Sequence, residues 1–400
     1  MPTAATQQQS TRSPGGGNSS GSAQRGQAVT PIVPFVRASS EHREPAGIDV
    51  SRQLIVGGTQ DLGVFDIPAY GYMRSLLITV TGTGGTGTPS FGEDYPFNVI
   101  RDIALTEPNG AVIAQFNTGY DLYLANKWGG IRDCAGADPR KSPGYNSGVT
   151  VGDFSFVLRI PIELNMRDAL GSLPNQNAAA TFKLRITLNT GAAAGPVWGG
   201  TAPTAQPTVR VVVLLEAWDQ PEPSVAGMSN QTTPPAMNTT QFWSSQIFTV
   251  GAGDQTIRLT RVGNYIRNLI LTYRRTAGTR VNGDADWPDP TTIYLDTRPL
   301  DRVPKTAWKH TMYERSGFGG RAPGGVLTAT LAADTAGGLD SGTFLYDFTH
   351  EFDGTLGQEN RDLWLPTLGS TRLELQGVFA NAGSLTVLTN DVAIAGPVFL

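Results

Sequence analysis

The sequence predicts an all-β protein of two tandem sandwiches with roughly eight strands each, a few short helices and a flexible N-terminal arm. The chain of 400 residues holds 48 Gly and 27 Pro and is only 16% charged. This composition is typical of short strands joined by turns, not of long helices. Apolar and polar residues alternate in many stretches, as in strands with one buried face. Several stretches recur about 190 residues later, which indicates a duplicated domain.

Residues 1–47 are predicted to form the N-terminal arm. Residues 1–28 are mostly Gln, Ser, Gly and Thr and include no aromatic residue, so they cannot bury enough apolar surface to offset the entropy lost on ordering. Residues 1–40 contain three arginines and no acidic residue, which makes the arm weakly basic. Residues 31–37 are apolar and extended by prolines, and they could dock on a neighbouring surface.

A second break in the pattern divides the rest of the chain. Residues 219–240 contain four prolines and little apolar periodicity, and prolines stiffen a connector while removing the donors that a strand needs. We therefore predict a first domain at residues 48–218, a linker at 219–240 and a second domain at 241–400.

The clearest predicted strands lie in the first domain. Residues 154–164 place Phe, Leu and Ile on one face, and residues 182–189 alternate apolar with charged or polar side chains. Residues 208–218 are apolar almost throughout, which predicts a more fully buried strand that closes the domain.

The strongest sign of duplication is a pair of matching strands. Tyr72 and Arg74 match Tyr265 and Arg267, 193 residues later, at the start of two apolar stretches. We predict that these four residues hold one repeated structural position, at the sandwich edge or a subunit contact, without catalysis. Other blocks repeat in the same order at separations of 190 to 194 residues: 103–106 with 293–296, 119–130 with 307–320, 154–162 with 344–352, and Arg167–Asp168 with Arg361–Asp362.

The order of these blocks predicts a specific fold. Each half has a short helical segment midway, at 119–130 and 307–320, ended by glycine. A second helical segment is expected after a long strand, at "RDALGSL" (167–173) and "RDLWLPTL" (361–368). Eight strands in two packed sheets form a jelly roll, so the sequence predicts two in tandem, a double jelly roll.

With these two halves, a Pro-rich linker and a polar arm, the chain resembles the double jelly-roll major capsid proteins of tailless icosahedral viruses, the tectivirus–adenovirus lineage. The resemblance covers roughly residues 48–400 and rests on architecture. It implies a structural virion protein of a tailless bacteriophage with an internal membrane. In that family three copies form a capsomer of pseudo-hexagonal outline, because each copy contributes two similar sandwiches.

The resemblance also implies partners and a location. The chain would bind itself, first as a homotrimer and then in the capsid lattice. Penton or minor capsid proteins, and an internal membrane reached by the N-terminal arm, are further implied partners. The protein would be made in the host cytoplasm, because the sequence shows no signal peptide or apolar span. The net charge of −4 requires no specific nucleic acid, and Arg267, Arg274 and Arg275 fit a solvated or subunit-facing edge.

No catalytic or cofactor motif is found, which indicates that the chain is not an enzyme. Asp284, Asp286 and Asp289 share one loop and are the one candidate metal site, since calcium takes carboxylate ligands. A solvated acidic loop is the favoured interpretation, because the glycine and glutamate of a calcium-binding EF-hand loop are missing. The single cysteine, Cys134, permits no intramolecular disulfide.

Two other functions are compatible with a tandem β-sandwich. Seven Trp and eleven Tyr would allow aromatic sugar platforms, as in a carbohydrate-binding or lectin-like module. The repeated positions of Tyr123 and Tyr313, however, indicate shared roles in the fold. A glycosidase would need two catalytic carboxylates, and nothing in the sequence singles out such a pair.

Overall fold

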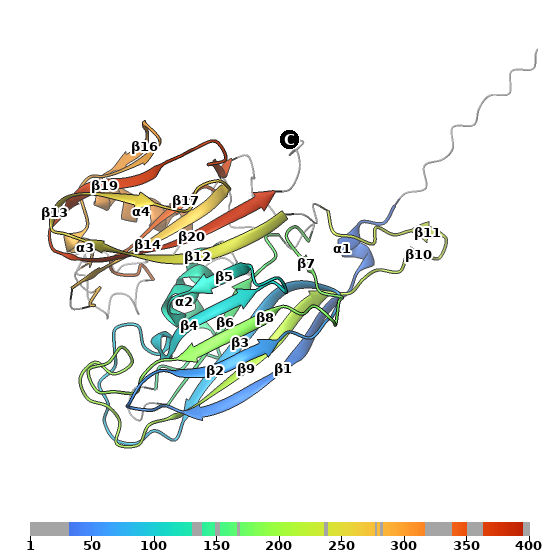
Figure 1. The fold of residues 1–400 in the computed structure, drawn as a ribbon, viewed down its shortest axis with the longest axis horizontal. Coiled ribbons are helices and arrows are strands. Elements are labelled where there is room, and N and C mark those ends of the chain that lie inside the picture. The colour runs from blue at the N-terminus through green and yellow to red at the C-terminus, as the bar shows by residue number, and fades with distance from the viewer. Residues whose placement is uncertain are drawn as a thin grey trace, which may run out of the picture.

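The structure, a computed structural model, contains two β-sandwiches joined along one side (Figure 1). Cys134, both Arg–Asp blocks and residues 1–31 lie outside the part of the chain that it describes. The described residues are 32–129, 138–148, 153–165, 169–235, 239–276, 278–280, 283–316, 338–349 and 363–394.

The first sandwich has two antiparallel sheets of four long strands. One sheet runs in the order β1 (Glu41–Gln53), β9 (Thr208–Trp218), β3 (Tyr72–Thr83) and β6 (Phe154–Pro161). The other runs in the order β2 (Gln60–Asp66), β8 (Lys183–Leu188), β4 (Ile100–Thr106) and β5 (Val112–Phe116). Counted along the domain, the first sheet holds strands one, eight, three and six, and the second holds two, seven, four and five. This is jelly-roll order.

The second sandwich repeats this order strand for strand. One sheet runs β12 (Thr239–Val250), β20 (Gly383–Ile394), β14 (Tyr265–Arg275) and β17 (Thr343–Asp347). The other runs β13 (Gly253–Leu259), β19 (Leu373–Phe379), β15 (Thr291–Leu295) and β16 (Arg298–Val303). The predicted double jelly roll is therefore confirmed.

The Tyr–Arg match marks a duplicated β-bulge. Tyr72 and Tyr265 each lie opposite the proline of a two-residue strand, β7 (Leu173–Pro174) or β18 (Leu365–Pro366). One residue later the register with the last strand of each sandwich shifts, so that Arg74 and Arg267 are the extra residues of the two bulges. A bulge bends its strand and redirects a side chain, which explains why this short pattern is shared by both halves.

One predicted alignment between the halves is wrong by four residues. Ile78 lies opposite Leu158, and the equivalent Leu271 lies opposite Phe344. Leu158 and Phe344 are therefore equivalent, 186 residues apart instead of the 190 predicted. Alternation has a period of two, so it cannot distinguish registers that differ by an even number of residues.

The two midway helices are present, whereas the described residues of the second expected pair, 169–173 and 364–368, form no helix. Helices α2 (Gly119–Trp128) and α4 (Lys305–Ser316) follow the fifth strand of each sandwich. In place of the later helix, Ala169 and Gly171 have positive φ and the chain turns into β7; β18 occupies the equivalent place. Pro174, directly after the first expected segment, and Pro366, within the second, lack the N–H that a helix interior requires. Four shorter helical elements are α1 (Phe35–Ala38), η1 (Phe97–Val99), η2 (Pro139–Lys141) and α3 (Gly283–Asp286).

The N-terminal arm is shorter than predicted, because β1 begins at Glu41. Phe35, in α1, is 1% exposed and packs edge-to-face against Tyr72 and Trp218, with ring centroids 5.4 and 6.5 Å away. The apolar segment around Phe35 therefore docks on its own chain. The first residues of β1, at 41–44, are charged, and one face of the strand is exposed. Apolar alternation in the sequence therefore does not reveal that the strand begins there. In the linker, β10 (Ser224–Val225) and β11 (Met228–Ser229) form a small hairpin.

A single sheet runs through both sandwiches. Strand β12 pairs in parallel with β5, with Trp243 opposite Ala114 and Ser244 opposite Gln115. The result is one continuous strand order, β17-β14-β20-β12-β5-β4-β8-β2 (Figure 1). The β2 sheet of the first sandwich thus continues into the β12 sheet of the second.

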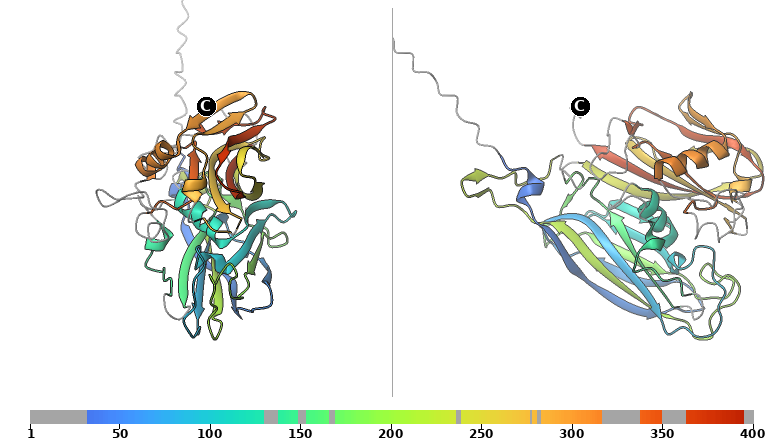
Figure 2. Two further views of the ribbon diagram at one scale, coloured as in Figure 1. Left: turned by 90° about the vertical axis from the view of Figure 1, so that its left-hand side faces the viewer. Right: turned by 180° about the vertical axis from the view of Figure 1, so that it is seen from behind.

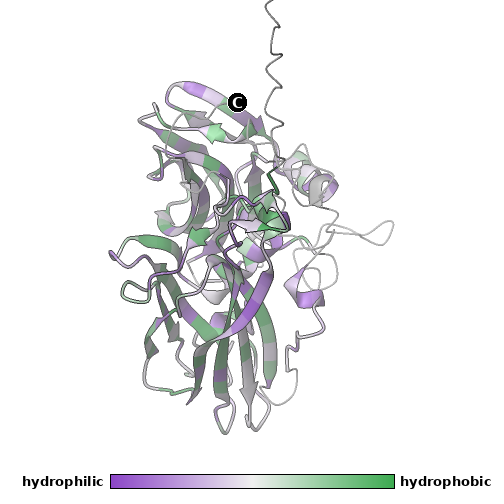
Figure 3. Cartoon of the chain, turned by 90° about the vertical axis from the view of Figure 1, so that its right-hand side faces the viewer, coloured by the Kyte–Doolittle hydropathy of each residue, from purple (hydrophilic) through white to green (hydrophobic). Residues whose placement is uncertain are grey.

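The apolar interior is also shared. Buried side chains from both sandwiches form one contiguous cluster, and apolar and polar positions alternate along the strands of the first sandwich (Figure 3).

The views from the side and from behind show α2 between the two sandwiches and α4 on the outside of the second (Figure 2). Within the described ranges, no helix has the length and apolar character of a membrane span.

Trp243→Ala is expected to lower the free energy of unfolding by about 3–5 kcal/mol, because it leaves a cavity at a buried aromatic position. Chemical denaturation followed by circular dichroism measures the change. The control is Val378→Ala, at a side chain that is 64% exposed, where the change should stay within about 0.5 kcal/mol. Equal effects of the two substitutions would contradict the buried role of Trp243.

Candidate functional site at the junction of the sandwiches

Helix α2 is the central element of the junction. Its first turn is capped by Thr118, whose side chain accepts from the backbone N–H of Asp121 at 3.0 Å. Nine of its ten residues are buried. At its C-terminal end, a Cβ on Gly129 would lie 2.6 Å from the Trp243 ring. The glycine predicted as a helix stop is thus needed for close approach of the second sandwich.

Asp340, from the second sandwich, lies fully buried against this helix. Its Oδ2 accepts from Lys127 Nζ at 2.7 Å and from Trp128 Nε1 at 3.0 Å. Its Oδ1 accepts from Tyr123 Oη at 3.3 Å and from Arg140. Two cations and three neutral donors, Trp128, Tyr123 and Tyr120, therefore surround one carboxylate that arrives from the other sandwich.

The charges of this cluster compensate each other. Asp138 lies 3.2 Å from Lys127 Nζ, so two carboxylates face two cations in the buried space. Burial alone would raise the pKa of Asp340, but Lys127 and Arg140 outweigh it and hold that pKa far below its ordinary value. A buried carboxylate that stays ionised in this way ties the two sandwiches together, since removing either partner leaves an uncompensated charge.

A second ion-pair cluster crosses the junction at the other end of α2. Arg274 and Arg280 of the second sandwich lie 2.6 and 2.7 Å from the carboxylate oxygens of Asp94 in the first. The backbone N–H of Arg280 donates to Glu93 at 2.6 Å. Burial favours a raised pKa for Asp94, but the two arginines prevail and the pKa is lowered. The Arg280 guanidinium also lies over the Tyr120 ring, 4.7 Å from its centroid.

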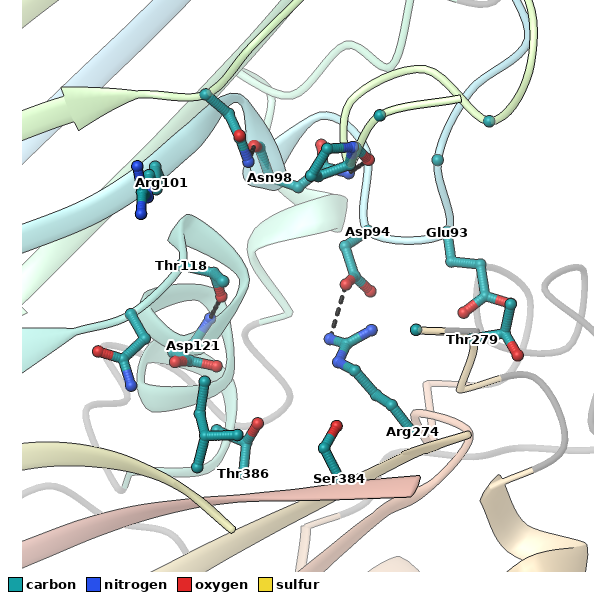
Figure 4. A pocket seen from close by; sticks show the side chains of 18 of the residues that line it. Glu93, Asp94, Asn98, Arg101, Thr118, Asp121, Arg274, Thr279, Ser384 and Thr386 are labelled. Carbon is teal, nitrogen blue, oxygen red and sulfur yellow. Dashed lines mark hydrogen bonds and ion pairs between the residues drawn. The ribbon is translucent and has the colours of Figure 1, made fainter. Parts of the chain in front are cut away.

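A cavity of about 740 Å³ opens beside this second cluster, between the two sandwiches (Figure 4). Asp121 and Arg274 face it from opposite sides. Burial raises the pKa of Asp121, and its Oδ2 accepts from Ser245 Oγ at 2.7 Å. Asn98 also lines the cavity, and its Oδ1 makes no hydrogen bond to the described residues. The lining contains neither histidine nor cysteine.

The repeated Tyr–Arg positions lie away from this junction cavity, inside their own sandwiches. Arg74 is 6% exposed; its guanidinium contacts Glu163 and Glu41 at 2.7 Å each and lies 4.3 Å from the Trp218 ring centroid. Arg267 is 2% exposed and donates to Asn390 at 2.5 Å. Both arginines stabilise a bulged strand start, and a role in subunit contact stays a prediction.

Two expectations about arginines and carboxylates need correction. Arg274 is largely buried and pairs across the junction, so it does not lie on a solvated edge. Arg275 pairs with buried Asp286 while its own side chain stays 38% accessible. These partners lie on other segments of the chain, which alternation along one strand cannot reveal.

The acidic loop is divided among separate partners. Asp286, 2% exposed, accepts from Arg275 at 2.9 Å, and this bond lowers its pKa. Asp284 lies 3.0 Å from Lys309 Nζ, and Asp289 accepts from the N–H that opens α4 at 3.2 Å. Among the described residues, no three His, Cys, Asp or Glu side chains are grouped so that they could hold a metal ion. The solvated-loop interpretation is wrong for Asp286, because the basic strand end packs onto it.

The tryptophans occupy interior positions, whereas one repeated pair of tyrosines differs in exposure. Tyr123 is fully buried, whereas Tyr313 is 42% exposed, so their predicted equivalence in role is wrong. The difference arises because α2 is covered by the second sandwich and α4 is not. All seven tryptophans are at most 6% exposed: Trp128, Trp198, Trp218, Trp243, Trp287, Trp308 and Trp364.

Comparison with known proteins identifies relatives by structure alone. No protein-family profile matches the chain, and no curated protein matches it by sequence. The major capsid protein P2 from bacteriophage PM2 matches with a TM-score of 0.51 and 10% identity, over 90% of this chain and 99% of that one. A chain of the Sulfolobus Turreted Icosahedral Virus matches with a TM-score of 0.56 and 12% identity, over 89% and 91%. A chain of the PBCV-1 virus capsid matches with a TM-score of 0.51 and 12% identity, over 88% and 94%. At such low identity the likeness establishes the shared fold.

Asp340→Asn is expected to reduce the free energy of unfolding at pH 7 by about 3–5 kcal/mol, because Lys127 and Arg140 lose their compensating charge. Denaturation at several pH values provides the test. Since the folded-state pKa is depressed, the contribution of Asp340 is present above about pH 4 and is lost as the pH falls further. The variant should therefore lose less stability than the wild type between about pH 5 and pH 2, the range in which an unfolded carboxyl titrates.

The matched control is Asp49→Asn, which removes an exposed ion pair with Arg210. It should change stability little, because water screens that pair. An acid dependence in Asp340→Asn identical to that of the wild type would contradict the assignment of Asp340 as the ionised junction carboxylate.

Proposed function

We propose that this chain is the major capsid protein of an icosahedral virus and that three copies form a capsomer of pseudo-hexagonal outline. The observation that carries the proposal is the single sheet that runs through two equivalent jelly rolls. It makes the chain one rigid block with two similar lobes, so three chains present six similar lobes. The proteins of similar fold that are named as capsid or major capsid proteins support the proposal.

The open edges of the sandwiches also support assembly. Strands β1, β2, β6, β13, β16 and β17 each end a strand order within the described chain. Sheet edges tend to pair unless they are covered or charged. Of these strands, β1, β2, β13 and β16 expose side chains along much of their length, whereas β6 and β17 are largely buried. A protein with such exposed edges, and with its ionisable junction residues paired with each other, is suited to lateral packing. We accordingly propose no catalytic role.

The lectin-like alternative is not favoured by the structure. Sugar platforms require exposed aromatic faces, and all seven tryptophans are buried. Two of them, Trp128 and Trp243, lie at the junction between the sandwiches, where they hold the fold together.

We extend the proposal to a tailless bacteriophage with an internal membrane, in which the protein is located in the virion after synthesis in the host cytoplasm. Penton or minor capsid proteins would be further partners. The weakly basic composition of residues 1–40 supports contact of the arm with an anionic membrane surface, and the net charge of −4 supports no specific contact with nucleic acid.

Purified full-length protein is expected to be a homotrimer at near-neutral pH and moderate salt. Size-exclusion chromatography with light scattering should give three times the mass of one chain. A stable monomer under all such conditions would contradict the proposal, whatever the stability of the fold.

Deletion of residues 1–28 is expected to leave trimer formation unchanged and to weaken binding to anionic lipid vesicles by roughly 30-fold. The deletion removes Arg12 and Arg25, and each basic residue near an anionic surface contributes about 1 kcal/mol. Vesicle flotation measures the binding. Arg12→Gln with Arg25→Gln in the full chain is the matched variant and should show the same loss; vesicle binding unchanged by either variant would rule out the arm as a membrane contact.

A further inference from the structure

The two midway helices have different surroundings although they occupy equivalent places. Helix α2 is covered on one side by its own sandwich and on the other by the second sandwich. Helix α4 packs on its own sandwich through Trp308, whose Nε1 donates to the Leu345 carbonyl at 2.8 Å. Its outer face exposes His310 and Glu314, with side chains 65% and 60% accessible, and Tyr313. The surface that the junction buries in the first sandwich is thus open in the second.

The first strands of the two sandwiches show the reciprocal difference. Each first strand pairs with the last strand of its own sandwich. When these pairings are matched, residues 41–45 of β1 are equivalent to residues 241–245 of β12. Trp243, which packs into the junction, is 1% exposed. The residue at its equivalent position is Arg43, whose side chain is 61% exposed. The face of the first strand that is covered in the second sandwich is therefore open in the first.

The strand edges complete the comparison. Inside the chain, fifth strand β5 pairs with first strand β12. The other fifth strand, β16, and the other first strand, β1, each end their sheet within the described chain. One copy thus carries both halves of a second junction at opposite ends of its two-sandwich block.

We propose that the junction inside the chain is repeated between copies: β16 and the outer face of α4 of one copy dock on β1 of the next. This inference rests on the proposed function and specifies its subunit contact. The contact is head-to-tail, and such a contact gives a closed ring when its rotation permits, here a ring of three copies with six sandwiches. Each ring would contain three internal junctions and three between copies.

The chemistry of the two surfaces fits a contact that forms after folding. Strand β1 exposes Glu41 and Glu44, with side chains 40% and 49% accessible, together with Arg43, while β16 exposes Arg298, Asp301 and Arg302. Both surfaces of the proposed contact thus carry charged side chains of both signs, where the internal junction has Trp243. A polar surface keeps the separate subunit soluble, and we expect the contact to weaken as ionic strength rises.

Cysteine cross-linking in the full-length protein tests the contact directly. In the internal junction Ser244 lies opposite Gln115. The equivalent positions are Glu44 in β1 and Arg302 in β16, when the register shifts that skip Ile113 and Leu300 in the two fifth strands are matched. Residues paired on neighbouring strands are close enough for a disulfide. In a Cys134→Ser background, Glu44→Cys with Arg302→Cys should oxidise to a covalent species of three chains on a non-reducing gel.

The control pair is Glu44→Cys with Val64→Cys. Val64 is 59% exposed on β2, which also ends its sheet but has no counterpart in the internal junction, so this pair should not cross-link. If the wild type is a trimer but the cysteines at positions 44 and 302 fail to cross-link, or cross-link no better than the control pair, the inference is overturned and the proposed function stays intact. A monomeric wild type would instead overturn the proposed function.

A second variant tests α4 without new cysteines. Tyr313→Asp places a charge on its outer face, away from the interior of the sandwich, and should raise the trimer dissociation constant at least tenfold, measured by light scattering on dilution. Val64→Asp is the matched control and should leave the constant unchanged. Equal constants for Tyr313→Asp and the wild type would contradict a buried α4 face in the trimer.

Discussion

The pairing of β5 with β12 is the contact on which the rest of the structure depends. It joins one sheet of the first jelly roll to one sheet of the second, and it places Trp243 against the end of α2. Because α2 is then enclosed between two sandwiches, every polar group on it must find a partner inside the protein. Asp340 and Ser245 of the second sandwich supply such partners.

The junction is therefore both apolar and charged. Burying ions costs free energy unless they are paired and hydrogen-bonded. In the first cluster, Lys127 and Arg140 form ion pairs with Asp340. In the second, Arg274 and Arg280 form ion pairs with Asp94. These pairs fix how one sandwich lies on the other. The ionisable groups of the junction are paired with one another, so they hold the two sandwiches in one relative position. The proposed role in a capsid lattice would require such a fixed arrangement.

The sequence predicted the parts of the fold that leave a local signal. Two jelly rolls and the two midway helices could be predicted from three signals. These signals are the alternation of apolar and polar residues, the Gly and Pro breaks, and the match of Tyr72 with Tyr265 at a separation of 193 residues. Alternation could not determine the register of β17, since shifts of two or four residues preserve it, and the charged start of β1 concealed a strand with an exposed face. The junction clusters were not predictable: Lys127 and Asp340 are 213 residues apart, and only the packing of the two sandwiches brings them together.

In the proposed capsomer, each chain contributes two equivalent sandwiches, so three chains present six similar sandwiches. Electron microscopy of the purified protein, averaged without imposed symmetry, tests this arrangement most directly. The account predicts rings of hexagonal outline with six similar lobes and true three-fold symmetry, in which contacts within and between chains resemble each other. Particles with two lobes only, or rings in which the contacts between chains differ in kind from the β5–β12 junction, would contradict it.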